Sequence, residues 1–392
     1  MPDGPPGAAG RPFAAGPHPE LNVAAADRLR DRLDGPVVVE RPRHTLAAIG
    51  LGLSARRLWW QSGRAARGPG GLTRDEFFYY RLYDPALSAQ ERLRFVGKVA
   101  QVRMHQACND PRWLAPVHDK ALFYTVMRGL GLPIPETVAA FEKTGRTFFW
   151  PSLRHEDELR AVLMSPRSYP LFAKPIDGIY SIGALELVGV EGETVRMKGG
   201  ASASVDDVIQ FIVAFGRNGY LFQKRLAPHP ALAERFGQTL GSVRLLVLEG
   251  PGGAAVESAV AKIPRPCNVA DNYWRPGNMV ASLDLQLGAI RRVVSGVGED
   301  MVTHEEHPDT NADLVGFTLP LWDQTVRLCL AGAKAFPGVR TQSWDVALTP
   351  SGPVLLEVNF GGDLNLHQLA HRRGALSDSF AAHLRRCGYR EV

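Results

Sequence analysis

The amino-acid sequence predicts an α+β fold in which strands dominate the middle of the chain and helices flank them. Residues 87–107 place apolar side chains near helical spacing, whereas short apolar runs bounded by Gly and Pro recur through residues 169–263. Two further apolar runs within residues 342–359 are joined by a Thr-Pro-Ser-Gly-Pro turn, which is the pattern of a β-hairpin. With 392 residues the chain exceeds the usual size of one domain, so two or three packed units are expected.

The predicted hairpin carries three oxygen-bearing side chains in an otherwise apolar run. Asp345 lies near the start of its first strand, and Glu357 and Asn359 lie near the end of its second. Antiparallel pairing therefore brings all three to one end of the ladder, with Glu357 and Asn359 on one face. Two carboxylates and an amide oxygen on rigid strands suit Mg²⁺, which leaves room for phosphate oxygens and water. An edge hairpin whose acids are merely solvated is the alternative.

The composition is that of a globular protein without a membrane-spanning segment. Hydrophobic residues make up 45% of the chain and charged residues 22%. No apolar run reaches the roughly 18 residues that cross a bilayer, and the N-terminus lacks the order of a signal peptide, so a cytoplasmic location is expected. The net charge of +5 is small for this length. We therefore expect anionic small molecules, and not nucleic acid, as partners.

The four cysteines form no C-x-x-C pair, which argues against a zinc ribbon, a redox dithiol or a disulfide framework. They are expected to be reduced and mostly packed. They are Cys108, Cys267, Cys329 and Cys387.

Lysine is rare in this sequence, with eight lysines among 45 Lys and Arg residues. Together with the high Ala, Gly and Pro content, this indicates a GC-rich bacterial genome. Because only lysine offers a compact ammonium group, a lysine in a suggestive context is a candidate phosphate ligand.

The first third of the chain is predicted to be a disordered Pro- and Gly-rich tail over residues 1–20, followed by a mainly helical region over residues 21–115. Residues 41–74 contain seven arginines, no acidic residue and the pair Trp59-Trp60. Such a stretch can lie on an anionic membrane surface or on a partner. A solvated helix face whose tryptophans pack inward is the alternative.

Helix, turn and strand signals alternate over the next hundred residues. Asp119 is a plausible N-cap of a helix that ends at Gly129 or Gly131, and prolines then favour an extended exit. A buried strand ends at Lys174, and a Gly- and Ser-containing loop at 178–183 leads into the next strand. Such a loop can fold over phosphates with its backbone N–H groups, although an ordinary hairpin turn is the alternative. The remaining predicted elements are strands at 220–226, 242–248 and 254–263 and helices at 319–335 and 375–386.

Five of these stretches, taken in order, resemble the ATP-grasp superfamily. They are Asp119-Lys120 before a Gly-Leu-Pro-Ile-Pro exit, Lys174-Pro175 with a loop ending Ser-Ile-Gly, Gln223-Lys224-Arg225-Leu226, Ala261-Lys262 and the acidic hairpin. His229-Pro230, Gly241 to Arg244, Asp271-Asn272, His307-Pro308 and Trp344-Asp345 resemble its sugar-transfer-associated group. The resemblance implies the ATP-grasp fold, with an N-lobe at 116–215 that carries the phosphate loop and a C-lobe at 216–392 that carries the metal site.

The resemblance also implies roles for individual residues. The hinge that reads adenine and the lysines under the loop would bind ATP, and the hairpin would hold two Mg²⁺ ions. The implied residues are Lys120, Lys174, Ser181, Gly183, Gln223, Lys224, Leu226 and His229 for the nucleotide; Arg244, Lys262 and Arg265 for catalysis; Asp345, Glu357 and Asn359 for the metal; and Asn272, Arg275, Asp363 and His367 for substrates.

The implied activity is that of an ATP-dependent carboxylate–amine ligase that forms an amide through an acyl phosphate and releases ADP and phosphate. Its substrates would be small molecules or peptides in secondary-metabolite or cell-surface biosynthesis. Two alternatives stay open: a membrane-surface component of polysaccharide assembly with a regulatory nucleotide site, and a kinase-like phosphotransferase. The sequence departs from the family at Lys262, where arginine is usual, and at residues 360–363 after the hairpin. The N-terminal helical region leaves the substrates, pathway and oligomeric state unassigned.

Overall fold

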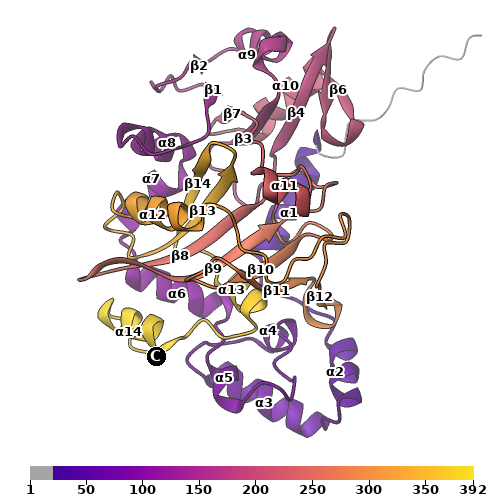
Figure 1. The fold of residues 1–392 in the computed structure, drawn as a ribbon, viewed down its shortest axis with the longest axis vertical. Coiled ribbons are helices and arrows are strands. Elements are labelled where there is room, and N and C mark those ends of the chain that lie inside the picture. Colours follow the sequence, from indigo (N-terminus) through magenta and orange to yellow (C-terminus); the bar gives the residue numbers. More distant parts are fainter. Residues whose placement is uncertain (1–20) are drawn as a thin grey trace, which may run out of the picture.

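The computed structural model describes residues 21–392 (Figure 1). The tail that was predicted to be disordered, residues 1–20, lies outside the described residues. Two seven-stranded sheets, both mostly antiparallel, form the centre of the molecule, and helices pack around them. The predicted α+β fold is therefore confirmed. Within residues 21–392, no helix has the length and apolarity needed to cross a membrane.

The first sheet lies in the upper part of Figure 1. It consists of β1 (Thr137–Phe141), β2 (Ser152–Leu153), β3 (Leu171–Pro175), β4 (Leu185–Glu191), β5 (Thr194–Met197), β6 (Ser202–Ser204) and β7 (Tyr220–Lys224). The strand order is β2-β1-β7-β3-β4-β5-β6, in which only the β1–β2 pair is parallel. Helices α9 (Glu156–Met164) and α10 (Val205–Phe215) share one hydrophobic core with these strands.

The second sheet crosses the middle of the molecule. It consists of β8 (Ser242–Gly250), β9 (Gly253–Ile263), β10 (Met279–Leu283), β11 (Ile290–Ser295), β12 (Val302–Thr303), β13 (Thr341–Thr349) and β14 (Gly352–Phe360), in the order β12-β11-β10-β9-β8-β13-β14. Helix α12 (Trp322–Ala333) packs on one face, and α6 (Lys98–Cys108), α13 (Leu364–His371) and α14 (Asp378–Arg386) pack on the other (Figure 1).

The other helices come mainly from the N-terminal region. They are α1 (Val23–Asp34), α2 (Arg41–Gly50), α3 (Ala55–Arg67), α4 (Arg74–Tyr79), α5 (Ala89–Leu93), α7 (Leu114–His118), α8 (Lys120–Gly129) and α11 (Pro230–Phe236), with short 3-10 turns η2 (Pro111–Trp113), η3 (Pro166–Ser168), η4 (Lys198–Gly200) and η5 (Gly298–Asp300). Helices α2, α3 and α5 form the lower end of the molecule in Figure 1, far from the first sheet.

The acidic hairpin has the predicted antiparallel pairing. Strands β13 and β14 turn at residues 350–351, and Asp345 lies directly opposite Glu357 while Ser343 lies opposite Asn359. On its other edge β13 pairs with β8, which places Arg244 beside Asp345. Because side chains at directly opposed positions share a face of a sheet, these polar groups all project to the same side.

The opposite face of the hairpin is fixed by a buried aromatic cluster. Trp344 is fully buried, and its ring centroid lies 5.8 Å from that of Phe123 in α8 and 5.9 Å from that of Phe336. A Cβ atom at Gly332 in α12 would lie 2.8 Å from the Trp344 ring, so only glycine allows this close approach. The aromatic face anchors the strand, and the acids on its reverse face gain fixed positions.

The N-terminal region is helical as predicted, but two local predictions are wrong. The periodic stretch at 87–107 is not one helix: α5 ends at Leu93, and α6 starts after Gly97, because residues 95–96 are buried against the C-terminal region instead of continuing a helix. Trp59 and Trp60 do not pack inward, since they are 61% and 53% exposed. Short helices α11 and α13 were not predicted.

Gln368 connects the N-terminal region to α13. Its Oε1 accepts from the Val96 N–H at 2.7 Å, and its Nε2 donates to the Val96 carbonyl at 2.9 Å. We expect Gln368→Leu to lower the free energy of unfolding by about 3 kcal/mol, because both backbone groups of Val96 lose their buried partner. Urea unfolding followed by circular dichroism measures this. The control Gln324→Leu, at an exposed position of α12, should change stability by less than about 0.5 kcal/mol; equal losses would contradict the assignment.

Candidate active site

A cleft lined by both sheets holds most of the predicted site residues. It encloses about 1040 Å³ including its open mouth, which is the upper end of the range for small-molecule sites. Its walls come from β3, β4 and β7 of the first sheet and from β8, β9, β13 and β14 of the second. The predicted residues that line it are Lys120, Lys174, Ser181, Gln223, Lys224, Leu226, Lys262, Asn272, Asp345 and Glu357.

Two lysines lie near Glu357 in the cleft. Lys120, at the start of α8, has its Nζ 3.6 Å from Glu357 Oε2 and also donates to the Gly178 carbonyl. Lys174, at the end of β3, donates to the Tyr124 hydroxyl at 2.8 Å. Burial lowers the pKa of Lys174 to about 8, although Glu357 and Asp345 act in the opposite direction. An ammonium group with this pKa gains from any anion placed beside it.

Asp345 is the centre of a buried ion cluster. Arg244 donates through Nε and a terminal N–H to its two oxygens, both at 2.7 Å, and Lys262 Nζ donates to Oδ2 at 2.9 Å. Lys262 also lies 3.2 Å from Asp271. Burial raises the pKa of Asp345, but the charges and hydrogen bonds of Arg244 and Lys262 outweigh it and hold the pKa well below its usual range. Asp345 is therefore ionised despite its burial.

The hairpin oxygens fit a hard divalent cation. Three of the roughly four lone-pair positions of Asp345 accept from cations, which leaves one on Oδ1. Glu357 is only half-buried and faces the cleft. Asn359 donates its amide N–H to the Ser343 carbonyl at 3.2 Å, so its Oδ1 stays available as an acceptor. Such a set of oxygen donors suits Mg²⁺ with several positions left for phosphate and water.

The predicted phosphate loop is tied to the second sheet's side of the cleft. Tyr180 and Ser181 have positive φ angles of 57° and 51°. The Trp274 indole N–H donates to the Tyr180 carbonyl at 3.0 Å, and the Arg275 guanidinium donates to the Ser181 carbonyl at 3.4 Å. Gly183 does not line the cleft, because it packs on the Phe215 ring and leaves no room for a side chain. The loop therefore lies over the cleft, held at its tip by Trp274 and Arg275.

The predicted adenine hinge follows β7. Gln223 is buried and donates to the Thr137 hydroxyl at 3.2 Å. The Lys224 ammonium donates to the Arg167 and Ser168 carbonyls, both at 2.8 Å, so its charge is directed out of the cleft. Leu226 supplies an apolar wall. These contacts engage the polar groups of Gln223 and Lys224, so backbone groups and the apolar Leu226 side chain remain to meet a planar base.

Several predicted residues lie outside the cleft. Arg265 is turned away into a bidentate pair with Asp309, so the structure does not bring it to Arg244 and Lys262. His229 caps α11, where its Nδ1 accepts from the Ala231 N–H at 3.2 Å, and it does not reach the position expected for a ribose neighbour.

Asp363, the N-cap of α13, and His367 within it do not line the cleft either. Asp363 caps the helix by accepting from the Asn365 N–H at 3.0 Å. His367 is buried, with Nδ1 2.7 Å from the Ser258 hydroxyl. Burial lowers the pKa of His367 well below its ordinary value, so the ring is neutral. Its Nε2 has no hydrogen-bond partner within residues 21–392.

The match to the sequence model of one protein family shows which family the chain belongs to. The family described as sugar-transfer associated ATP-grasp matches residues 100–382. The chain belongs to this family. No curated protein sequence matches it.

Three solved structures are similar to this chain at low sequence identity. The D-alanine–D-alanine ligase from Coxiella burnetii is 12% identical with a TM-score of 0.40, covering 71% of this chain and 60% of that one. The ATP-grasp ligase PsnB in complex with a minimal precursor is 15% identical with a TM-score of 0.36, covering 80% and 76%. N5-carboxyaminoimidazole synthase from Aspergillus clavatus, in complex with ADP and 5-aminoimidazole ribonucleotide, is 14% identical with a TM-score of 0.40, covering 74% and 57%. The chain thus spans about 60% of the first of these proteins.

Three residues of the ATP-grasp cleft were not predicted. Tyr124 contacts Lys174 and donates to the Leu356 carbonyl at 2.7 Å; its position one helical turn after Lys120 was a usable signal. Asp271 accepts from Ser242 at 2.6 Å and pairs with Lys262. Trp274 holds the loop, and nothing in its sequence context indicated this contact.

The ion cluster of the ATP-grasp cleft leads us to predict how replacing Asp345 changes the free energy of unfolding. We expect Asp345→Asn to lower the free energy of unfolding by about 3–5 kcal/mol, because Arg244 and Lys262 stay buried without their shared counter-ion. Glu357→Gln is the matched variant: Glu357 is half-buried and faces Lys120 at 3.6 Å, so the loss should be below about 1 kcal/mol. Chemical denaturation at pH 7 measures both. Equal losses of stability in the two variants would mean that the ion pairs of Asp345 do not stabilise the protein more than the contact of Glu357 does.

Proposed function

We propose that this chain is an ATP-dependent carboxylate–amine ligase that forms an amide or peptide-type bond through an acyl phosphate and releases ADP and phosphate. The observation that carries the proposal is the cleft itself, in which Lys120 and Lys174 face Glu357 and the Asp345 cluster across the space between two sheets. Membership of the sugar-transfer associated ATP-grasp family supports a place in the biosynthesis of a cell-surface or secondary metabolite.

The proposed chemistry needs positioning and charge neutralisation more than acid–base groups. A carboxylate is a poor electrophile until its oxygen is phosphorylated, after which an amine can displace phosphate. Lys120 and Lys174 would hold the phosphate chain, and Arg244 and Lys262 present fixed positive charge beside Asp345. These groups are preorganised by burial, so they stabilise transferred charge without reorganising at the moment of reaction.

The hairpin would hold two Mg²⁺ ions through Glu357, Asn359 and the remaining lone pair of Asp345. Bound magnesium would neutralise the phosphate oxygens and align the γ-phosphoryl group with its acceptor. Glu357 is the principal ligand in this proposal, because Arg244 and Lys262 already occupy most of Asp345. Lys120 lies close enough to Glu357 to orient its carboxylate.

The phosphate loop would exclude water from the acyl phosphate. Tyr180 and Ser181 are held by Trp274 and Arg275 through backbone carbonyls, so the contact does not consume the loop N–H groups that would meet phosphate oxygens. A covered site of this kind protects a reactive intermediate from hydrolysis. Asn272 lines the same region, and its Oδ1 has no partner within residues 21–392.

The acceptor substrate would lie beside α13, beyond the Asp345 cluster. Three buried polar atoms there lack partners within the described chain: Ser343 Oγ, Asn365 Oδ1 and His367 Nε2. Buried polar atoms without partners are rare in folded proteins and commonly mark ligand positions. A neutral His367 and a serine hydroxyl suit an uncharged amine or hydroxyl-bearing acceptor better than a second anion.

The activity is tested by trapping the acyl phosphate with hydroxylamine. Full-length protein with ATP, Mg²⁺ and a panel of amino acids and sugar acids should give a hydroxamate, with ADP and phosphate in equal amounts. Glu357→Gln should reduce the rate about 100-fold, the loss typical of one charge-positioning group, while the exposed Glu193→Gln should leave it unchanged. ADP without phosphate would favour the kinase-like alternative, and nucleotide binding without turnover on any acid would favour a regulatory site.

The pKa of Lys174 predicts how nucleotide binding depends on pH. With a pKa of about 8 in the free protein, the ammonium is charged at pH 7 and neutral at pH 9. Phosphate binding favours the charged form, so the affinity for Mg-ADP should weaken by up to about tenfold per pH unit above pH 8.

Lys174→Arg is the matched variant, because arginine keeps its charge throughout this range. Its affinity should change little between pH 7.5 and 9.5, whatever its absolute value. Isothermal titration calorimetry at several pH values measures both proteins. Parallel pH profiles would show that Lys174 does not bind the phosphates.

A further inference from the structure

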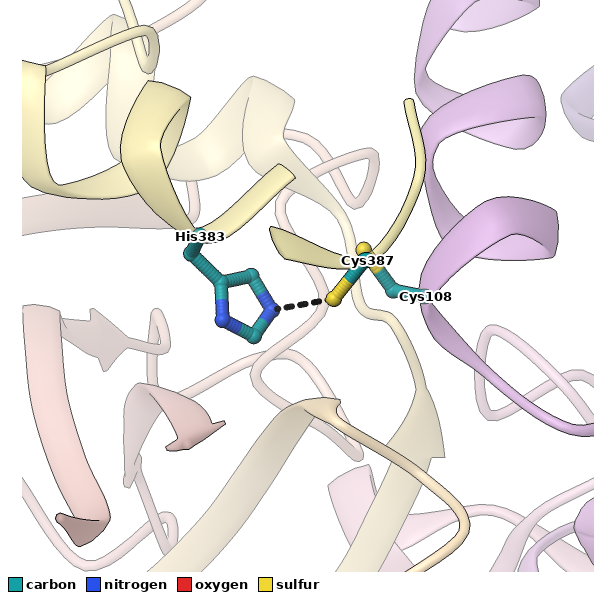
Figure 2. Close-up of side chains that lie close together, drawn as sticks. All are labelled: Cys108, His383 and Cys387. Atoms are coloured by element: carbon teal, nitrogen blue, oxygen red, sulfur yellow. Dashed lines mark hydrogen bonds between the residues drawn. The ribbon is translucent and has the colours of Figure 1, made fainter. Parts of the chain in front are cut away.

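Two cysteines that are far apart in sequence meet a histidine between α6 and α14, on the face of the second sheet that these helices cover (Figure 2). Cys108 is the last residue of α6, whereas His383 and Cys387 lie one turn apart at the end of α14. The three potential ligand atoms all lie within 4.8 Å of one another. The absence of a C-x-x-C pair excludes only zinc sites whose ligands are close in sequence. These three ligands are brought together by tertiary structure.

The spacing of these atoms is close to that of a metal site. In a tetrahedral zinc site, ordinary bond lengths place a sulfur and a nitrogen ligand about 3.5 Å apart and two sulfur ligands about 3.8 Å apart. The Cys387 sulfur lies 3.5 Å from His383 Nε2. Figure 2 shows the imidazole with this nitrogen turned toward the sulfur atoms. Histidine and cysteine four residues apart share a helix face, so α14 alone supplies two ligands without distortion.

The surroundings hold the three side chains in position. The Arg340 guanidinium donates to the Cys108 carbonyl at 2.8 Å, and Asn109 exchanges two hydrogen bonds with the backbone of Thr341 at 2.9 and 3.0 Å. The Thr341 hydroxyl lies 3.1 Å from His383 Nε2 and is the hydrogen-bond partner that a metal ion bound to this nitrogen would replace. Cys108 and His383 are each 1% exposed, whereas Cys387 is partly exposed. The cluster is therefore built on buried supports and has one side open to an entering ion.

We propose that Cys108, His383 and Cys387 bind one Zn²⁺ ion, with water in the fourth position. Two sulfur ligands and one imidazole form a donor set that binds Zn²⁺ in preference to Mg²⁺ or Ca²⁺, because the latter two ions take oxygen ligands. The ion clamps α6 and α14 onto the start of β13. Thr341 precedes Asp345 by four residues on that strand, which corresponds to about 13 Å along the backbone of β13.

A disulfide between Cys108 and Cys387 is the competing use of the same sulfurs. A disulfide has no need of His383, whose Nε2 is directed at Cys387 and Thr341. The C-terminal ends of α6 and α14 also meet here, and their partial negative charges favour a cation. The geometry therefore favours the metal.

The test uses full-length protein, reduced and freed of metal, titrated with ZnCl₂ or CoCl₂ in excess Mg²⁺ so that the carboxylates of the cleft do not compete. We expect one tightly bound equivalent of zinc, and a cobalt form with a thiolate-to-cobalt charge-transfer band and the strong visible bands of tetrahedral cobalt. Cys387→Ser and His383→Gln should lose the bound equivalent. Cys267→Ser removes an exposed thiol outside the cluster and should keep it.

Each other outcome overturns the proposal. If the reduced wild-type protein binds no zinc and gives no charge-transfer band, the proposal is wrong, and no variant is needed to show it. The proposal is also wrong if the only change seen in the wild-type protein is the 2 Da mass loss of a Cys108–Cys387 disulfide. Retention of the zinc equivalent by a folded Cys387→Ser variant places the metal elsewhere. Because Cys387 is partly exposed, this variant should fold, and circular dichroism checks that it does.

Discussion

The buried pairing of Asp345 with Arg244 and Lys262 is the constraint on which the rest of the structure depends. Three ionised side chains on three adjacent strands lose most of their hydration, and their mutual contacts at 2.7–2.9 Å, together with the contact of Lys262 with Asp271 at 3.2 Å, compensate. The contacts require β8, β9 and β13 to keep one register. A slip of one residue in β13 would turn Asp345 toward the aromatic core around Trp344 and take its carboxylate away from both cations. The ion cluster thus specifies the sheet as well as the site.

Because of the same cluster, the two acids of the hairpin, Asp345 and Glu357, have different roles. Asp345 keeps its charge because two cations hold it, and for that reason it has little capacity left for another ligand. Glu357, directly across the ladder, is half-buried and has one lysine at 3.6 Å. Asp345 therefore stabilises the sheet and positions Arg244 and Lys262, whereas Glu357 faces the cleft. Sequence reasoning treated the two carboxylates as equivalent because only their positions along the strands were visible.

The features that local sequence could predict are those whose cause is local. The hairpin follows from two apolar runs and a turn, and Lys174 with its loop follows from a strand that ends at a lysine before glycines. Arg265 was misplaced because its partner Asp309 lies 44 residues away and competes for it. His229 was misplaced because helix capping, and not ligand binding, uses its ring. Cys108 and Cys387 come together only when the first and last helices of the family-matched region pack on one sheet face.

Close packing explains the two glycines that follow the hairpin. The ring of His105 in α6 lies where a Cβ of Gly361 would be, at 2.2 Å, and Ser343 occupies the corresponding space at Gly362. Any larger residue at Gly361 would displace α6, and any larger residue at Gly362 would displace Ser343 of β13. Gln101 of α6 accepts from the Leu364 N–H at 3.0 Å and so fixes the start of α13. Burial lowers the pKa of His105 to about 4, so this contact is made by a neutral ring. The α6 helix, most of which lies inside the family-matched segment, therefore packs beside the wall where we propose that the acceptor substrate lies.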